Sequence, residues 1–357
     1  MKIFYAIQAT GNGHIARAIE LIPYLEKYGK VDVFLSGSNS TLATTNILPV
    51  KYRSKGISLQ YGNHGGLNYW NTLKQFAPLR VYKEAQQLPV EKYDIVINDF
   101  ESITSLACRM KKISSVNFGH QASFQSDKVP RPGKKSIAGE LVLKHYAPAA
   151  CYVGLHFKQY DDFILPPVIK KDILEAEDVF DKGHVAVYLP HFSDLQLVKR
   201  LKQLKDIKFE VFSKRVTRTE VNKNVTFVPI DNKAFSASVR HAAGVITGAG
   251  FETPSETLYL GKKLMVVPIH GQYEQLCNAE ALKHFDVPVL EDLDHNFTGI
   301  TTQWLSGKGQ KKLDLPYSTG HIISRVINTA LSAKENGNFI PTYSNINPSL
   351  AINTSSL

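Results

Sequence analysis

Short apolar segments alternate with amphipathic segments along most of this 357-residue chain, and this alternation constrains the fold more than any other feature. Residues 2–7, with an apolar run over residues 3–7, predict a first strand. In residues 15–28 the apolar side chains return every three or four positions, as on one face of a helix. Residues 31–35, 94–98 and 115–118 are further apolar segments. Uniformly apolar strands separated by helices are typical of a parallel sheet that is covered on both faces.

The same alternation begins again in the second half of the chain, after Pro166 and Pro167 break regular structure. Its apolar segments are residues 184–189, 209–212, 225–228, 244–246 and 263–268. We therefore predict an α/β protein of two Rossmann-like domains, whose parallel sheets face an interdomain cleft. The predicted parts are an N-terminal domain over residues 1–162, a linker over 163–182, a C-terminal domain over 183–316, a helix over 317–339 that packs back on the N-terminal domain, and a polar tail over 340–357.

The amino-acid composition indicates which class of protein this chain belongs to and which kinds of partner it binds. The 43% of hydrophobic and 21% of charged residues are typical of a soluble globular protein, and no apolar run is long enough for a membrane helix. The three cysteines lie far apart and fit no disulfide framework or zinc motif, which favours a reducing cytoplasm. The net charge of +10 indicates an anionic partner or a solvated basic surface. Because the basic patches are not interleaved with aromatic residues, we expect no nucleic-acid partner.

The turn after the first predicted strand holds the first candidate chemistry. Gly11, Asn12 and Gly13 precede His14, and the glycines allow a ligand to approach the backbone at the positive end of a helix. These three residues are candidates for contact with phosphate or acceptor. A neutral His14 could take a proton from an acceptor hydroxyl, although a histidine here could also cap or pack a helix.

Two further side chains are expected at the same edge of the first sheet. Asp99 follows one apolar segment, and a carboxylate there would orient the imidazole of His14. Asp99 could instead cap the next helix, with Glu101 and Ser102 as rivals for that position. His120 follows the next apolar segment and is a second candidate base or acceptor contact.

The second half carries a longer pattern, in which a glycine-rich loop follows a predicted strand and precedes a helix. Backbone N–H groups, hydroxyls and the helix N-terminus of such a turn form a cradle for a diphosphate. The residues of this predicted cradle are Thr247, Gly248, Ala249, Gly250, Phe251, Thr253 and Ser255. Thr253 or Ser255 is expected to cap the helix, and Glu256, one turn later, has a carboxylate that can accept two ribose hydroxyls.

A second polar segment follows the next predicted strand, which ends at Pro268. There the side chains of Glu274 and Gln275 can form hydrogen bonds with the hydroxyls of a hexose. Either half of the pattern alone could be an ordinary glycine-rich loop or a polar helix cap. Their order and spacing together favour a nucleotide-sugar site.

Residues 244–279, GVITGAGFETPSETLYLGKKLMVVPIHGQYEQLCNA, resemble the donor-binding region of GT-B glycosyltransferases. The likeness is greatest to the bacterial family 28 transferases that add N-acetylglucosamine to the lipid-linked peptidoglycan precursor, and to related UDP-sugar transferases. Residues 11–18, GNGHIARA, resemble the first loop of that group, which ends in histidine. The resemblance implies a GT-B fold, an acceptor-binding N-terminal domain and a C-terminal domain that binds a nucleoside-diphosphate sugar, with a UDP-sugar preferred. It also implies inversion at the anomeric carbon, with no cofactor and no obligatory metal.

The same resemblance assigns roles to single residues. It implies that Ala249, Gly250 and Thr253 lie near the diphosphate, and that Glu256 binds the ribose. Glu274 and Gln275 would contact the sugar, and the backbone of Ile230 would lie beside uracil. His14 would be the base, and Asp99 would orient it. Gly248 departs from the family, which has a basic residue there, so the group that neutralises the diphosphate stays open. Residues 188–194 replace the usual glycine-rich loop, and His191 and Ser193 become phosphate candidates, although His191 could equally be a surface loop residue.

The sequence therefore predicts a glycosyltransferase that moves a hexose or N-acetylhexosamine to an acceptor hydroxyl. A sugar-nucleotide 2-epimerase of GT-B fold and a non-catalytic protein that binds a sugar nucleotide are the alternatives. Such epimerases normally have arginine and glutamate in the first loop, and residues 8–14 contain neither. The sequence does not decide whether the acceptor is a cell-envelope glycan, a glycolipid or a small molecule. The basic charge and the aromatic loops at residues 61–70 and 118–124 are compatible with a lipid-linked acceptor at a membrane surface and also with a soluble acceptor. We therefore expect a cytoplasmic protein, which in the first case is peripheral on the inner face of the membrane.

Overall fold

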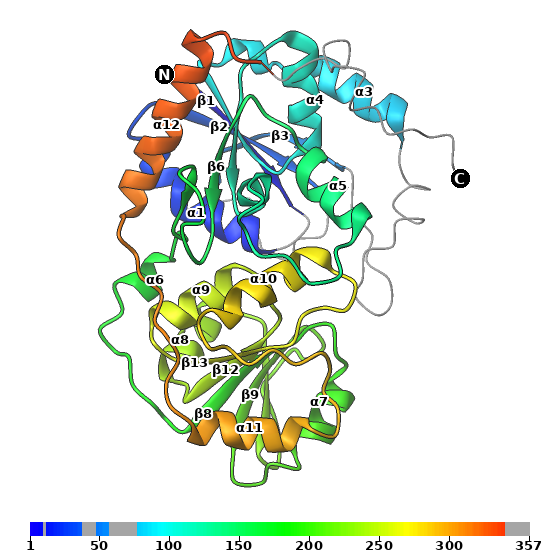
Figure 1. Ribbon diagram of the computed structural model, residues 1–357, viewed down its shortest axis with the longest axis vertical. Coiled ribbons are helices and arrows are strands. Elements are labelled where there is room, and N and C mark those ends of the chain that lie inside the picture. The colour runs from blue at the N-terminus through cyan, green and yellow to red at the C-terminus, as the bar shows by residue number, and fades with distance from the viewer. Residues whose placement is uncertain (10–11, 38–47, 57–76, 340–357) are drawn as a thin grey trace.

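The computed structural model describes residues 1–9, 12–37, 48–56 and 77–339, and its two halves are stacked along the long axis (Figure 1). Each half is built around one sheet with helices packed beside it. Gly11, the aromatic segment 61–70 and the tail 340–357 lie outside the described residues, and Asn12 is described only as the first residue of a helix.

The N-terminal half contains a parallel sheet of seven strands in the order β3-β2-β1-β4-β5-β6-β7. Its strands are β1 (Lys2–Gln8), β2 (Lys30–Ser36), β3 (Val50–Ser54), β4 (Ile95–Asp99), β5 (Val116–Gly119), β6 (Cys151–Leu155) and β7 (Ile164–Leu165). Its helices are α1 (Asn12–Leu25), α3 (Pro78–Gln87), η1 (Val90–Lys92), α4 (Ser102–Lys111), η2 (Gln121–Gln125) and α5 (Ile137–His145). Strand β7 falls within the predicted linker, so the sheet extends slightly beyond the expected boundary.

The C-terminal half contains a sheet of six strands in the order β10-β11-β9-β8-β12-β13. After the short helix α6 (Lys171–Leu174), its strands are β8 (His184–Tyr188), β9 (Lys208–Ser213), β10 (Glu220–Asn222), β11 (Val225–Pro229), β12 (Gly244–Thr247) and β13 (Lys263–Val266). Its helices are α7 (Asp194–Leu201), α8 (Asn232–His241), α9 (Glu252–Tyr259), α10 (Tyr273–Lys283) and α11 (Phe297–Ser306). The predicted parallel arrangement holds except at the edge, where β10 pairs antiparallel with β11.

The last described helix, α12 (Thr319–Glu335), crosses back to the N-terminal half (Figure 1). It packs against α1 and strands β4, β5 and β6, with Ile322, Ile323 and Val326 buried. The Ser318 side chain caps its start by accepting the backbone N–H of His321 at 3.2 Å. Within the described part of the chain, every helix is too short or too polar to span a lipid bilayer.

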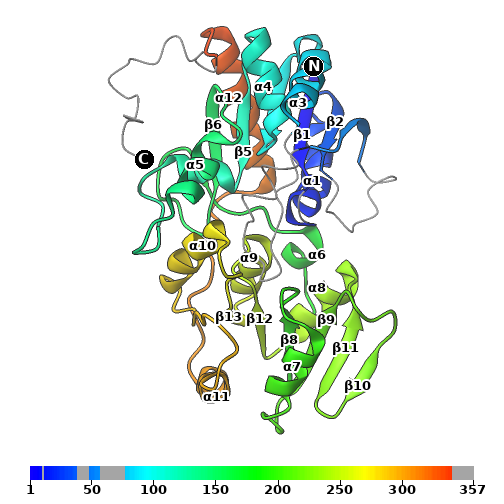
Figure 2. The same cartoon turned by 90° about the vertical axis from the view of Figure 1, so that its right-hand side faces the viewer.

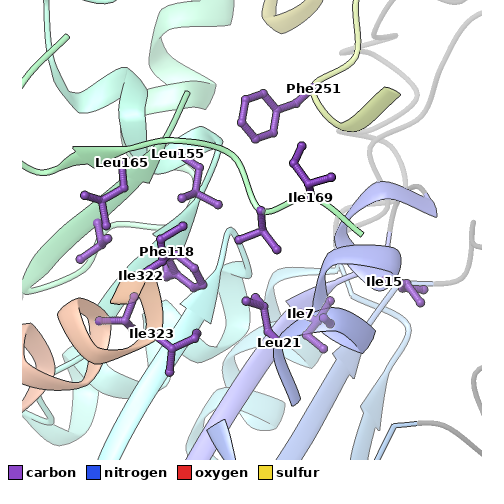
Figure 3. Close-up of a cluster of buried hydrophobic side chains, with 14 of the residues drawn as sticks. Ile7, Ile15, Leu21, Phe118, Leu155, Leu165, Ile169, Phe251, Ile322 and Ile323 are labelled. Atoms are coloured by element: carbon purple, nitrogen blue, oxygen red, sulfur yellow. The ribbon is translucent and has the colours of Figure 1, made fainter. Parts of the chain in front are cut away.

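One hydrophobic core cluster continues from the N-terminal half into the C-terminal half. It includes Ile7, Phe118 and Ile322 of the N-terminal half and Phe251, the residue before α9, and Figure 3 shows the Phe251 ring beside Ile169. Helices α9 and α10 lie between the two sheets (Figure 2). The carboxyl ends of the C-terminal strands therefore face the N-terminal half, which is where open α/β sheets bind their ligands.

Candidate functional site

A cavity of about 520 Å³ lies at the carboxyl edge of the C-terminal sheet. The turns after β8, β9, β11, β12 and β13 all contribute to its wall, and Gly13 and Ala16 of α1 face it from the other domain. Such a volume is within the usual range for small-molecule sites. The predicted residues that line it are Gly13, His191, Ile230, Thr247, Gly248, Gly250, Phe251, Thr253 and Gln275.

The loop after β12 is held open toward this cavity by side chains of α10. Gln275 Oε1 accepts the backbone N–H groups of Ala249 at 3.1 Å and Ile269 at 2.9 Å, and Asn278 donates to the Ala249 carbonyl at 3.0 Å. The Ala249 N–H, predicted to contact the diphosphate, is therefore already engaged. Gln275 lines the cavity but uses its oxygen to shape the loop, so only its amide nitrogen remains for a sugar.

The expected cap of α9 is wrong. The helix begins at Glu252, after Phe251, and neither Thr253 nor Ser255 caps it. Ser255 lies inside the helix, where its hydroxyl donates to the Phe251 carbonyl four residues earlier at 2.7 Å. Its side chain is fully buried and does not line the cavity, whereas Thr253 does.

Glu256 is buried and paired with a residue that the sequence did not point to. The Lys170 ammonium lies 3.1 Å from Oε1 and 3.2 Å from Oε2 of Glu256. Burial raises the pKa of the Glu256 carboxyl, and Lys170 opposes that shift. Lys170 lines the cavity and Glu256 does not, so the predicted contact between Glu256 and a ribose requires Lys170 to move aside.

Two further groups in the cavity suit an anion. His191 lines the wall, and neither of its ring nitrogens has a hydrogen-bond partner in the described structure. Burial lowers the pKa of His191 to about 4, so the ring is neutral at pH 7 and keeps one N–H to donate. Lys214, directly after β9, also lines the cavity and forms no ion pair within the described residues. Lys214 can supply the charge that is missing at Gly248.

Ser193, the other candidate in the β8–α7 turn, has a local structural role. Its hydroxyl accepts the Gln196 backbone N–H at 3.3 Å and donates to the Gln196 side chain at 2.7 Å, in a capping box at the start of α7. It does not line the cavity. The two candidates of this turn therefore differ, and only His191 is placed to meet a ligand.

His14 and Asp99 are brought together as predicted. Parallel pairing sets Ile7 of β1 opposite Asp99 of β4, so the carboxylate ends beside the start of α1. His14 Nδ1 lies 2.9 Å from Asp99 Oδ1. Burial lowers the pKa of His14, but the Asp99 charge and hydrogen bond outweigh burial and hold it above its usual value. Glu101, not Asp99, caps α4, by accepting the N–H groups of Ile103 and Thr104.

Arg17 completes this cluster and was missed in the sequence. Its Nη2 lies 2.9 Å and 2.8 Å from the two Asp99 oxygens, and its Nη1 pairs with Glu252 of the C-terminal domain. Burial raises the pKa of Asp99, but Arg17 and His14 outweigh burial and hold it below its usual value. The spacing of three positions between His14 and Arg17 on one helix was the available signal.

His120 is not placed to act as a base. It is 1% exposed, its two ring nitrogens lie 2.9 Å from the Leu155 carbonyl and 2.8 Å from Asn278 Oδ1, and its ring stacks on Phe251. Phe251 and Asn278 belong to the other domain. His120 is therefore part of the contact between domains, and burial lowers its pKa.

Polar contacts from α10 close the same interface. Glu274, predicted to read sugar hydroxyls, accepts from the Gln121 amide at 3.1 and 3.2 Å and does not line the cavity. The Tyr273 hydroxyl donates to Glu140 at 2.7 Å. A Cβ at Gly139 would lie 2.4 Å from the Tyr273 ring, so the close fit requires glycine there. The two domains are closed on each other.

A family model described as "Glycosyl transferase family 1" matches residues 1–303. The chain belongs to this family. No curated protein matches it in sequence.

Solved structures agree with the family at the level of fold. The glycotransferase of kitacinnamycin has a TM-score of 0.57 at 15% identity and covers 93% of this chain and 95% of its own. LpCGTa in complex with UDP has a TM-score of 0.56 at 13% identity, over 93% and 94% of the two chains. Arabidopsis thaliana UGT89C1 complexed with UDP has a TM-score of 0.55 at 12% identity, over 92% and 94%. The predicted GT-B fold is confirmed.

Proposed function

We propose that this glycosyltransferase moves a hexose or N-acetylhexosamine from a UDP-sugar to an acceptor hydroxyl, with inversion. One observation carries the proposal: His14 lies on α1, paired with Asp99 at the end of β4, and its neighbours Gly13 and Ala16 on the same helix face the cavity formed by the turns of the other domain. Transfer between two bound substrates needs a base in one domain and a cavity for the donor in the other. UDP as the carrier is supported by the two structural neighbours that bind it.

His14 acts first on the acceptor. Its Nδ1–H donates to Asp99, which leaves the lone pair of Nε2 to take the acceptor proton. The acceptor oxygen then bonds to the anomeric carbon as the bond from that carbon to the UDP oxygen breaks. Asp99 stabilises the imidazolium that forms, since its carboxylate is buried and held by Arg17.

The departing UDP is stabilised by groups of the C-terminal domain. We assign Gly248, Gly250, Thr253 and the N-terminus of α9 to the diphosphate, together with the His191 N–H and the Lys214 ammonium. The Ile230 backbone, on the same wall, is assigned to the uracil. Because Lys214 and the helix N-terminus supply positive charge, we propose that transfer needs no metal ion, and EDTA should leave the rate unchanged.

The experiment begins with the nucleotide. UDP, GDP and dTDP are compared by thermal shift, because a ligand that binds only the folded protein raises its melting temperature in proportion to its affinity. UDP-sugars are then offered with a panel of acceptors, and the product anomer is determined by NMR. His14→Ala should abolish the product, whereas His145→Ala, at the end of α5, should not. Full transfer by His14→Ala would contradict the base assignment.

The two alternatives predict other outcomes in the same assay. A 2-epimerase would change UDP-sugar incubated without acceptor, and a binding protein would give a thermal shift and no product with any acceptor. The family match does not favour either alternative. Epimerised donor from the wild-type chain would replace the present proposal.

We also propose that the acceptor is presented at a membrane surface. Helix α5, which packs against α10 of the other domain, exposes 81% of Ile137 and 50% of Leu141, one turn apart, and follows Lys134 and Lys135. Apolar side chains next to lysines suit an anionic lipid interface. Wild-type protein should sediment with vesicles that contain anionic lipid and not with neutral ones, and Ile137→Asp should reduce this binding. Equal recovery with both vesicles would contradict the proposal.

A further inference from the structure

Arg17 lies where it can decide which nitrogen of His14 carries the proton. Its Nη2 is 3.0 Å from His14 Nδ1, and the same Nη2 is 2.9 Å and 2.8 Å from the two oxygens of Asp99. Arg17 is only 4% exposed, so water does not compete for these contacts. The three side chains form one cluster, in which Arg17 and Asp99 are buried.

The hydrogens available cannot satisfy all these contacts at once. Nη2 has two hydrogens and three acceptors within 3.0 Å, namely both Asp99 oxygens and a bare His14 Nδ1. If both hydrogens go to Asp99, Nδ1 must carry its own hydrogen, which it donates to Asp99. Nε2, which the Gln121 amide nitrogen approaches to 3.5 Å, then keeps its lone pair and can act as a base. If Arg17 donates to Nδ1, the proton of the neutral ring lies on Nε2, and His14 cannot accept another there.

The other end of Arg17 is held by the donor-binding domain. Its Nη1 pairs with Glu252, the first residue of α9, and Glu252 also lines the donor cavity. Gly13 gives the Glu252 carboxylate the room it needs, since a Cβ there would lie 2.7 Å from Glu252 Oε2. This contact crosses the interface, so it exists only while the two domains are closed.

We propose that Arg17 and Glu252 are an interdomain positioning pair that holds His14 in the base-competent tautomer when the donor-binding domain closes. Glu252 anchors Nη1 and turns both hydrogens of Nη2 toward Asp99. When the domains separate, the anchor is lost and Arg17 is free to donate to His14 Nδ1. The inference rests on the proposed function. In this arrangement, the Arg17–Glu252 pair makes the base available only after the donor-binding domain has closed.

The charges around His14 predict a second measurable effect of Arg17 and Glu252, on the pH dependence of the rate. The charged or titratable groups that face this cluster are Tyr5 of β1, Arg17 of α1, Asp99 of β4, Glu252 of α9 and, beyond the Gln121 amide, Glu274 of α10. Glu252 favours the protonated form of His14 and Arg17 opposes it. Removing Glu252 should therefore shift the acid limb of the rate profile to lower pH, and removing the charge of Arg17 should shift it to higher pH. A purely structural role would give no such opposite shifts.

The test uses Glu252→Ala and Glu252→Gln in the full chain, with Glu280→Ala on α10 as the matched control. Histidine labelled with ¹⁵N, assigned by a His14→Gln variant, shows which ring nitrogen carries the proton. We expect Glu252→Ala to move the His14 proton from Nδ1 to Nε2 and to lower kcat at least tenfold, since a positioned base contributes about 10²–10⁴-fold. The donor KM should not rise, because a carboxylate near the diphosphate is removed. Glu252→Gln should keep more of the tautomer, because its amide oxygen still accepts from Nη1.

The outcomes separate this inference from the proposed function. An unchanged tautomer and an unchanged kcat in Glu252→Ala would overturn the positioning role, even with an active transferase. A tautomer change in a chain without transferase activity would leave the positioning role standing and remove the proposed function. Arg17→Lys keeps the charge but cannot serve Asp99 and Glu252 together, so it should repeat the loss of kcat in a folded protein. Wild-type kcat in Arg17→Lys would also overturn the inference.

Discussion

Asp99→Asn is the substitution that most sharply tests the arrangement of the N-terminal site. Asp99 is fully buried, lies 2.9 Å from His14 Nδ1 and accepts hydrogen bonds from Arg17 at 2.9 and 2.8 Å. Asparagine keeps the shape but removes the charge, and its amide N–H can face His14 Nδ1 and favour the wrong tautomer. Because a general base contributes about 10²–10⁴-fold, we expect kcat to fall by that factor, which corresponds to about 3–5 kcal/mol.

The assay measures initial transfer rates over a range of donor concentrations, with UDP affinity determined separately. UDP affinity should stay unchanged, since Asp99 does not line the donor cavity. Arg17 would lose one of its two carboxylate partners and keep only Glu252, and breaking a buried ion pair costs up to about 3–5 kcal/mol of unfolding free energy, so a thermal melt must show that the variant is folded at the assay temperature. Asp94→Asn, one residue before the same strand and exposed, is the matched control. A folded Asp99→Asn with kcat within threefold of wild type would refute the reasoning.

Three further predictions follow from the geometry. As the proposed base, His14 would have to be neutral, and its pKa is raised. In a pH profile, kcat/KM should therefore rise as pH passes through a value above about 6.5, and in Asp99→Asn this rise should move to lower pH. Lys214→Met and His191→Ala should each weaken UDP binding by about tenfold, measured by titration calorimetry, and should also lower kcat, because both groups are proposed to stabilise the departing UDP; wild-type affinity in both would exclude them from the phosphate site. Gly139→Val should collide with Tyr273, lower the transfer rate and leave UDP affinity intact, and an unchanged rate would show that this contact does not matter for closure.

The fold was predictable because buried strands and helices leave periodic apolar patterns. The strand that ends at Asp99 and the glycine-rich turn before His14 both lie at the carboxyl edge of the sheet, so their proximity followed from a parallel arrangement. The antiparallel edge strand β10 was not expected, since its Val221 is exposed and its sequence carries no apolar alternation.

The contacts between the domains could not be predicted from the sequence. Glu256, Glu274 and His120 were predicted to meet substrate from their residue types and their places in the chain. The structure pairs them with Lys170, Gln121 and Asn278 respectively, each of which comes from a segment far away in sequence. No local pattern indicates such pairs. Lys214 could have been found, because it lies two residues after the strand predicted over residues 209–212, at the edge of the sheet that binds ligands.

The central claim is that UDP-sugar binds in the C-terminal cavity while His14, from the other domain, activates the acceptor. The most direct test is a single-turnover transfer experiment with wild-type protein and His14→Ala, with UDP affinity measured on the same preparations. We predict equal UDP affinity in the two proteins and a loss of the transfer rate of about 10²-fold or more in the variant. A His14→Ala protein that transfers sugar at the wild-type rate would contradict the account.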